Sequence, residues 1–202
     1  MNKTKVAVLV SGGGTNLQKI LEAQAAGKTP HAEVVLVLSD HKDAYALKRA
    51  ENFGIATAVV EKTGTQDAFE NAVISALRES GAEMIVLAGF LRILTAKFIG
   101  EYENRIINVH PSLIPSFCGK GFYGLKVHEA ALNKGVKVTG ATVHFVNEIP
   151  DGGAIIAQKA VEVKEGDTPE ILQKRVMEEA EWILLPQAVE TVAEKILMEK
   201  AQ

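Results

Sequence analysis

Short apolar runs alternate with helix-like segments through the first half of the chain, and this alternation limits the possible fold more than any other feature. The runs at 5–10, 32–40 and 84–90 are apolar at nearly every position, as in parallel strands covered on both faces. The segments between them have apolar residues at helical spacing. This βαβ series predicts an open, mainly parallel α/β sheet flanked by helices. The expected strands are 5–10, 32–40, 56–61, 84–90 and 105–110, and the expected helices are 15–27, 43–54 and 66–80.

The pattern changes in the C-terminal half. The expected elements are a helix over 125–135, strands over 136–147 and 154–163, and a helical region over 168–199. The two strands follow each other closely, so we expect an antiparallel pair, the first half-exposed and broken at Gly140. Pro186 is expected to kink or split the last helix. Without a low-complexity linker or repeat, the prediction is one domain over 1–202, a twisted α/β sheet with an antiparallel annex in its C-terminal half.

Composition and charge narrow the class of partner. The chain is 47% hydrophobic, enough for a sizeable core, and its net charge of −3 provides no basic surface for nucleic acid or an anionic membrane. One cysteine permits no intrachain disulfide and fits a reducing cytosol. The apolar run at 5–10 is shorter than a signal-peptide core or a membrane span. We therefore expect a cytoplasmic protein with small-molecule partners, either a monomer or a homodimer.

A glycine-rich loop joins the first strand to the first helix. Gly12, Gly13 and Gly14 precede Thr15 and Asn16 at the expected helix start. Glycines let a backbone approach a ligand closely, and a helix start directs free N–H groups at an anion. The simpler alternative is a tight turn in which Thr15 caps the helix. Three consecutive glycines exceed what a cap needs, so the loop favours phosphate binding.

A nicotinamide enzyme is a weaker alternative for the same loop. The dinucleotide fingerprint requires a third glycine where this chain has Leu17. Asp40, however, ends the second strand, where an acid that binds a ribose would lie.

Polar side chains stand at the end of the fifth buried strand. Asn108 and His110 lie on one face of that strand, and Pro111 stops it. At the carboxyl end of a parallel sheet, they would meet a ligand and stabilise a developing oxyanion. The alternative is a capping asparagine and a satisfied core histidine. Asp151, before two glycines, either forms an Asx turn or charges and orients His110, raising its pKa above about 6.5.

Other candidates are less decisive. His144 either lines the site or lies half-exposed. For Arg92 three alternatives stay open: its side chain binds an anion, its backbone binds a flat heterocycle, or its side chain is simply solvated. Trp182 is expected to pack in the core. Cys118 has no base partner and is not expected to be a nucleophile. No metal-binding spacing is present, so no metal is expected.

Four motifs together resemble a known family. They are SGGGTNLQ at 11–18, LAGFLRIL at 87–94, NVHPSLIP at 108–115 and VTGATVHFVNEIPDGG at 138–153. The resemblance is to the phosphoribosylglycinamide formyltransferases, folate-dependent enzymes of purine synthesis, and it runs along essentially the whole chain. It implies a Rossmann-like formyltransferase domain without the added C-terminal domain of relatives acting on initiator methionyl-tRNA. It equally implies no N-terminal regulatory domain like that of formyltetrahydrofolate hydrolases.

The resemblance also implies roles for individual residues. The catalytic residues would be Asn108, His110 and Asp151, acting in direct attack of the amine of 5-phosphoribosylglycinamide on the formyl group of 10-formyltetrahydrofolate. The ribonucleotide, bound mainly by the N-terminal half, would contact Gly13, Gly14, Thr15 and Asn16 through its phosphate and Glu181 through its ribose. The folate, bound mainly by the C-terminal half, would contact Gln66, Leu91, Arg92, Ile93, Leu94, Asn147, Glu148, Ile149 and Pro150. Gln66 departs from the family, which often has an arginine there. The loop at 116–128 is longer and richer in glycine than many family versions, so no role is assigned to it.

Overall fold

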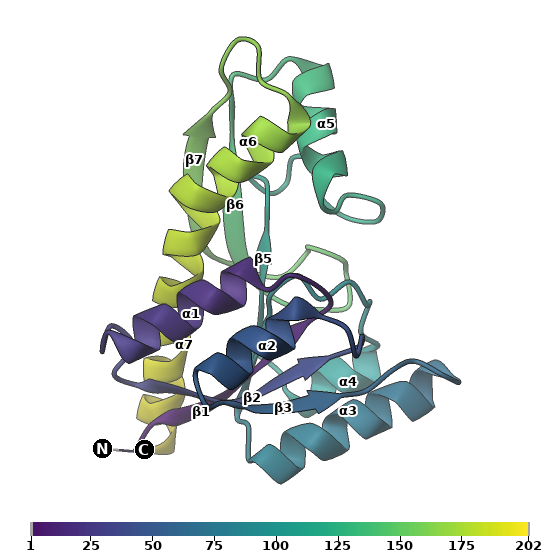
Figure 1. Cartoon of the computed structure of the whole chain (residues 1–202), viewed down its shortest axis with the longest axis vertical. Helices are drawn as coiled ribbons and strands as arrows, with labels where there is room; N and C mark the ends of the chain where they lie inside the picture. Colours follow the sequence, from purple (N-terminus) through teal and green to yellow (C-terminus); the bar gives the residue numbers. More distant parts are fainter. Residues whose placement is uncertain (1, 202) are drawn as a thin grey trace.

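A seven-stranded sheet organises the molecule (Figure 1). The computed structural model describes residues 2–201, and the strand order is β3-β2-β1-β4-β5-β6-β7. The strands are β1 (Thr4–Val10), β2 (Ala32–Ser39), β3 (Ala56–Val59), β4 (Met84–Leu87), β5 (Ile106–His110), β6 (Val138–Phe145) and β7 (Ile155–Glu162). Strands β1 to β5 pair in parallel, whereas β5–β6 and β6–β7 are antiparallel. The predicted fold class is therefore confirmed.

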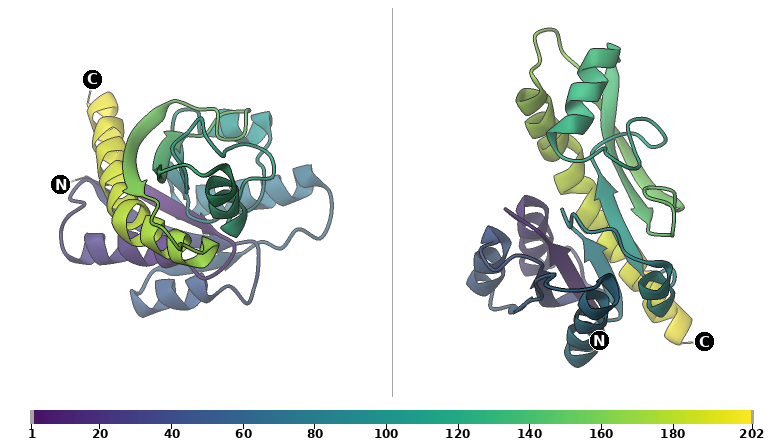
Figure 2. Two further views of the ribbon diagram at one scale, coloured as in Figure 1. Left: turned by 90° about the horizontal axis from the view of Figure 1, so that it is seen from above. Right: turned by 90° about the vertical axis from the view of Figure 1, so that its right-hand side faces the viewer.

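Helices cover both faces of the sheet. The helices are α1 (Thr15–Ala25), α2 (Tyr45–Asn52), α3 (Gln66–Ser80), α4 (Ala96–Glu101), α5 (Leu125–Lys134), α6 (Pro169–Val176) and α7 (Trp182–Lys200). Alternate residues of β1 point to opposite faces: Val8 joins a core with α1, α2 and α7, and Leu9 joins one with α3 and α4. The pair β6–β7 extends away from the parallel strands, with α5 and α6 beside its far end (Figures 1 and 2). No helix within residues 2–201 combines the length and apolarity needed to cross a bilayer.

Threonine caps define the helices on the α3 face. The Thr65 hydroxyl accepts a hydrogen bond from the Ala68 N–H at the start of α3, and Thr95 does the same for Phe98 at the start of α4. Helix α3 matches the predicted 66–80. The sequence reading missed α4, because six residues are too few to show a helical period.

Two expectations about β6 are wrong. Its residues from 139 to 144 are buried, and Gly140 continues the ladder by pairing with Ala160 instead of breaking it. A Cβ atom at Gly140 would lie 2.1 Å from the Lys159 carbonyl oxygen and 2.8 Å from Leu113 Cδ2. The glycine therefore permits close approach of β7 and of the 111–118 segment, and this coverage is what buries the strand.

The C-terminal helical region is not split at Pro186. That residue lies within α7, and the irregularity falls earlier, in a π-helical turn η1 (Met177–Glu181) between α6 and α7. Turns of this type widen a helix locally and occur often at functional sites. Here the turn ends at Glu181.

The topology places a crevice at the carboxyl ends of the central strands. Strand β1 pairs with β2 on one side and with β4 on the other, so successive connections leave the sheet in opposite directions. In open α/β sheets ligands bind at this switch point. The glycine-rich loop after β1 and the segment after β4 both begin there.

We expect Gly140→Ala to destabilise the protein by about 1–3 kcal/mol, the usual cost of overpacking, because the Lys159 backbone and the half-buried Leu113 side chain must move. Gly100→Ala in α4 is the matched control, since a Cβ atom there meets nothing within 4 Å and alanine favours helix. Urea unfolding of both variants measures the difference. Equal midpoints for the two variants would contradict this account of β6.

Candidate active site

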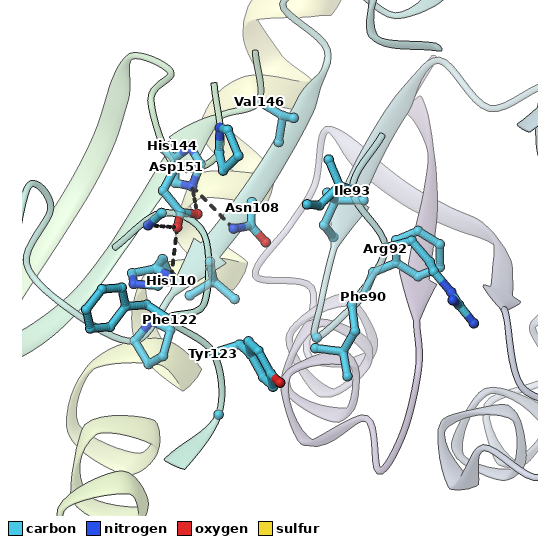
Figure 3. Close-up of a pocket in the computed structure, with 18 of the residues that line it drawn as sticks. Phe90, Arg92, Ile93, Asn108, His110, Phe122, Tyr123, His144, Val146 and Asp151 are labelled. Carbon is cyan, nitrogen blue, oxygen red and sulfur yellow. Dashed lines mark hydrogen bonds and ion pairs between the residues drawn. The ribbon is translucent and has the colours of Figure 1, made fainter. Parts of the chain in front are cut away.

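A pocket of about 790 Å³ opens at the carboxyl ends of β1, β4 and β5. It is lined by segments that are distant in sequence (Figure 3). These are Thr15 and Asn16, residues 89–94, residues 108–111, residues 119–124, residues 146–151, and Gln173, Met177 and Glu181. The pocket therefore combines the glycine-rich loop region, the end of β5 and the loop between β6 and β7.

Strand β5 brings the predicted catalytic side chains into this pocket. Asn108 pairs with His144 across the β5–β6 ladder, and His110 pairs with Thr142. Asn108 and His110 both line the pocket, as their shared strand face predicts, and Asp151 approaches them from the loop after β6 (Figure 3). The structure thus brings together the three residues and adds His144, whose place the sequence left open.

Asp151 is held between two histidines and a backbone amide. Its Oδ2 lies 3.5 Å from His110 Nδ1 and accepts a hydrogen bond of 2.8 Å from the Gly119 N–H, and its Oδ1 lies 3.5 Å from His144 Nε2. Burial by itself would raise the pKa of Asp151. The contacts with His144, the Gly119 amide and His110 outweigh burial and lower that pKa. The carboxyl group is therefore ionised at neutral pH.

The pKa of His110 is lowered, which corrects the expectation that it is raised. Burial is the largest cause and favours the neutral ring, since His110 is only 4% exposed. Asp151 and the Phe117 carbonyl act in the opposite direction, as expected of acceptors, but they do not offset burial. The sequence indicated the carboxylate, whereas the extent of burial depends on the tertiary structure.

One loop engages both members of the His110–Asp151 pair. His110 Nε2 lies 2.9 Å from the Phe117 carbonyl oxygen, while the Gly119 N–H donates to Asp151. Phe117 has a φ of 50°, a conformation that costs energy for an aromatic residue. In this conformation the loop backbone, and not a ligand, satisfies Nε2 of His110.

His144 orients the Asn108 amide. His144 Nδ1 lies 2.8 Å from the Phe145 carbonyl oxygen, and its Nε2 lies 3.2 Å from Asn108 Nδ2. A carbonyl only accepts, so Nδ1 carries a proton, and Nε2 lies between the Asn108 amide and the Asp151 carboxylate. His144 is buried, so the alternative of a half-exposed position is wrong.

The glycine-rich loop divides into structural and open positions. A Cβ atom at Gly14 would lie 2.6 Å from that of Ala46, whereas one at Gly12 or Gly13 would meet nothing within 4 Å. Gly14 is also the N-cap of α1 and no side chain caps this helix, so Thr15 is not its cap. Packing therefore accounts for one glycine and leaves open space at the other two. Gly13 lines a separate small pocket of about 510 Å³, not the large one.

Asn16 and Glu181 meet inside the large pocket. Asn16 Nδ2 donates a 2.7 Å hydrogen bond to Glu181 Oε2, which joins α1 to the π-helical turn. Burial raises the pKa of Glu181, and the hydrogen bond from Asn16 only partly opposes this. Trp182, expected to pack, follows directly, and its ring lies under the Lys19 ammonium at 5.1 Å.

Eight of the nine predicted folate contacts line the large pocket. They are Leu91, Arg92, Ile93, Leu94, Asn147, Glu148, Ile149 and Pro150. The Arg92 guanidinium points away from the histidine cluster (Figure 3), and its Nε donates to Asp40 Oδ2 at 2.6 Å. The ninth residue, Gln66, is not among the lining residues and instead donates to the Ile93 carbonyl and to Glu70. The Asp40 side chain is only 1% exposed, and Arg92 holds its Oδ2. It is therefore not accessible to a ribose, and the nicotinamide alternative loses its support.

The sequence reading assigned no role to the loop that closes the pocket. Residues 119–124 form part of its wall, together with Phe90, Gln173 and Met177. Phe122 and Tyr123 stand among closely spaced glycines, and this local signal could have indicated an aromatic wall of the pocket.

Cys118 is not activated as a nucleophile. It donates to the Pro115 carbonyl, and burial, followed by the charge of Asp151, raises the pKa of its thiol and disfavours the thiolate. Within residues 2–201, no group of three or more His, Cys, Asp or Glu side chains has the arrangement of a metal site.

Comparisons of the sequence and of the structure with known proteins indicate the same family. A family model described as formyl transferase matches residues 4–189.

The chain belongs to the formyl transferase family.

Named relatives refine this membership and confirm the resemblance seen in the motifs. The chain is 47% identical over 194 residues to the trifunctional purine biosynthetic protein adenosine-3 of Gallus gallus, covering 95% of this chain and 19% of that protein. It is 41% identical to the chloroplastic phosphoribosylglycinamide formyltransferase of Arabidopsis thaliana, covering 88% of this chain and 61% of that protein. The chain therefore spans less than two thirds of the length of either relative.

Solved structures of this formyl transferase family share the fold. Glycinamide ribonucleotide transformylase 1 from Symbiobacterium toebii superposes with a TM-score of 0.89 at 39% identity, covering 96% of this chain and 89% of that one. Phosphoribosylglycinamide formyltransferase from Brucella melitensis gives a TM-score of 0.86 at 41% identity, covering 95% and 96% of the two chains. At these identities the similarity extends beyond the fold to the family.

We expect Asp151→Asn to lower the pKa of His110 further, because the carboxylate is the main contact that opposes burial. A lower folded-state pKa means that the unfolded chain binds the proton more readily below about pH 6.5. The free energy of unfolding of the variant should consequently fall more steeply as the pH drops from 6.5. NMR titration of the His110 ring measures the pKa directly.

Asp67→Asn, on the exposed first turn of α3, is the control for that titration and should leave the His110 curve unchanged. An unchanged or raised His110 pKa in Asp151→Asn would show that the two residues are not electrostatically coupled.

Proposed function

We propose that the chain transfers a formyl group from 10-formyltetrahydrofolate to the amine of 5-phosphoribosylglycinamide, a step of purine biosynthesis. We further propose that it acts in the cytoplasm, as a monomer or homodimer, on small molecules and without a nucleic acid, membrane or metal partner. The observation that carries the proposal is the meeting of Asn108, His110 and Asp151 in one pocket of a formyl transferase fold. Relatives named phosphoribosylglycinamide formyltransferase support the choice of substrates.

The pocket offers suitable surfaces for both substrates. Thr15, Asn16 and Glu181 present polar groups beside the start of α1, where a helix dipole favours a phosphate. Leu91, Ile93 and Ile149 are exposed apolar side chains of the same pocket, which suits the flat folate ring system. We assign the ribonucleotide to the first group, with Gly13 and Gly14 completing its phosphate loop. We assign the formyl donor to residues 91–94 and 147–150.

The reaction would begin with attack of the ribonucleotide amine on the formyl carbon. A C–N bond forms, and the carbonyl oxygen takes negative charge in the tetrahedral intermediate. The Asn108 amide and the His110 N–H would donate hydrogen bonds to that oxyanion, and loss of one such donor typically costs about 2.7–4 kcal/mol. The bond from the carbon to N10 of the folate then breaks. The amine loses a proton and N10 gains one, through water beside Asp151.

The lowered pKa of His110 fits this scheme. A neutral ring at pH 7 carries one proton to donate and still accepts another when the amine releases its own. Asp151, ionised beside it, would stabilise the imidazolium that forms. Before this, the Phe117 carbonyl must release Nε2 of His110, so substrate binding would be coupled to movement of the 116–124 loop. No thiol is required, which agrees with the raised pKa of Cys118.

Formyl transfer itself is the direct test of the proposal. Protein, ribonucleotide and 10-formyltetrahydrofolate are mixed, and the appearance of free tetrahydrofolate is followed by its absorbance. We expect turnover in the wild type and a loss of at least about 100-fold in kcat for His110→Ala, as for an oxyanion donor. Cys118→Ser should keep most of its kcat. Ribonucleotide binding without turnover by the wild type would reduce the protein to a nucleotide-binding module.

Replacement of an open glycine tests the phosphate loop. Gly13→Val should fold normally, since a Cβ atom there meets no neighbour within 4 Å, but it should strongly raise the KM for the ribonucleotide by blocking an approaching phosphate. The KM for the formyl donor should change little. Gly64→Val is the control at another glycine with open space. Unchanged ribonucleotide affinity in folded Gly13→Val would remove the loop from the phosphate site.

A further inference from the structure

The pocket wall from Gly89 to Thr95 has no regular secondary structure. Phe90 and Leu94 are buried in the core on the α3 face. Leu91 and Ile93 between them are 64% and 67% exposed, so apolar packing does not fix the part of the segment from 91 to 93. A loop with few buried apolar contacts opens easily unless other groups restrain it. Between the buried side chains of Phe90 and Leu94, the shape of the segment therefore depends on hydrogen bonds from outside it.

Two of these bonds come from the ends of neighbouring strands. The Ser11 hydroxyl, after β1, accepts a 3.0 Å hydrogen bond from the Leu91 N–H. Asp40, after β2, accepts from Arg92 Nε at 2.6 Å, and its carboxylate is buried at 1% exposure. Charge-assisted bonds to a buried carboxylate are stronger than bonds between neutral groups. Arg92 is thereby directed outward, and only its backbone is left for the pocket.

Two more bonds come from helix α3. Gln66 Nε2 donates to the Ile93 carbonyl oxygen at 3.2 Å and to Glu70 Oε1 at 2.8 Å. Glu70, itself buried, accepts from the Thr95 N–H at 2.8 Å and also from the Thr95 hydroxyl. Gln66 and Glu70, one turn apart on α3, thus hold the segment at Ile93 and at Thr95. The hydrogen bond between their own side chains fixes both of them in place.

These contacts fall on alternate residues of the segment. The restrained backbone groups are the N–H of Leu91, the carbonyl of Ile93 and the N–H of Thr95. Among the hydrogen bonds formed within residues 2–201, none uses the backbone N–H or C=O of Arg92 or Leu94. Both residues line the pocket. A flat heterocycle with donors and acceptors at its edge is the ligand that such free backbone groups suit.

We propose that Gln66, supported by Glu70, is a positioning residue for the formyl donor. It holds the 91–95 backbone so that the free groups of Arg92 and Leu94 meet the edge of the folate ring, and it does so without contacting the folate. This inference rests on the proposed function, because it concerns the site assigned there to 10-formyltetrahydrofolate. It differs from the direct folate contact that the family resemblance implies for Gln66.

Gln66→Ala is the main test. Gln66 is only half-buried and the Thr65 cap of α3 is retained, so the variant should fold. We expect the KM for 10-formyltetrahydrofolate to rise about two- to tenfold, as for loss of one hydrogen bond. The kcat and the KM for the ribonucleotide should stay within about twofold of the wild-type values, because the lost hydrogen bond does not touch the ribonucleotide. Amide hydrogen exchange of residues 91–95 should become faster by a similar factor.

Asn71→Ala is the matched control, since it truncates an exposed amide on the same helix and should change neither KM nor exchange. Glu70→Gln, which keeps the side-chain shape, should move both readouts in the same direction as Gln66→Ala. Unchanged donor KM and unchanged exchange in Gln66→Ala would overturn the proposal, as would an equal rise in both KM values. Absence of formyl transfer by the wild type would instead overturn the proposed function, and exchange at 91–95 would still decide whether Gln66 restrains the segment.

Discussion

Strand β5 pairs in parallel with β4 along one edge and antiparallel with β6 along the other, and the polar contacts of the pocket depend on this change of direction. The parallel side places the end of β5 at the switch point of the sheet. The antiparallel side sets His144 opposite Asn108 and returns the chain so that Asp151 arrives beside His110. The three side chains meet because the sheet reverses here.

Burial then decides how these groups are charged. Isolated polar groups in a buried site are costly, and here each has a partner. The acceptors around His110 favour an imidazolium, but desolvation outweighs them and keeps the ring neutral, whereas Asp151 keeps its charge through the amide of Gly119 and the adjacent histidines. The result is the charged carboxylate of Asp151 beside the neutral ring of His110. Burial keeps the His110 ring unprotonated in the absence of a reaction, and the adjacent carboxylate favours its protonation when a proton is released nearby.

Much of the fold and part of the site were readable in the sequence because they rest on local patterns. Uniform apolar runs predicted the buried strands, and alternation placed Asn108 and His110 on one side. The failures have a common physical origin. Coverage of β6 comes from the 111–118 segment and from α6, the π-helical turn and α7, so its burial is a tertiary property that its own alternating pattern did not show. The pKa of His110 likewise follows from burial, which no motif encodes. For Gln66 a motif position indicated the neighbourhood of the pocket, whereas its bonds to Ile93 and Glu70 follow from the direction of its side chain, which no motif encodes.

Backbone groups account for the remaining part of the site, and they explain why side-chain motifs were an incomplete guide. Phe117 O and Gly119 N engage His110 and Asp151, and the segment after β4 offers the pocket its peptide groups while its one charged side chain turns to Asp40. Any residue except proline can supply a peptide group, so such contacts leave only indirect traces in a sequence: glycines where the chain bends sharply, and polar side chains elsewhere that hold the backbone in place. Ser11, Asp40, Gln66 and Glu70 are traces of the second kind. They surround the pocket wall from outside, and their identities become interpretable only once the fold shows which backbone they restrain.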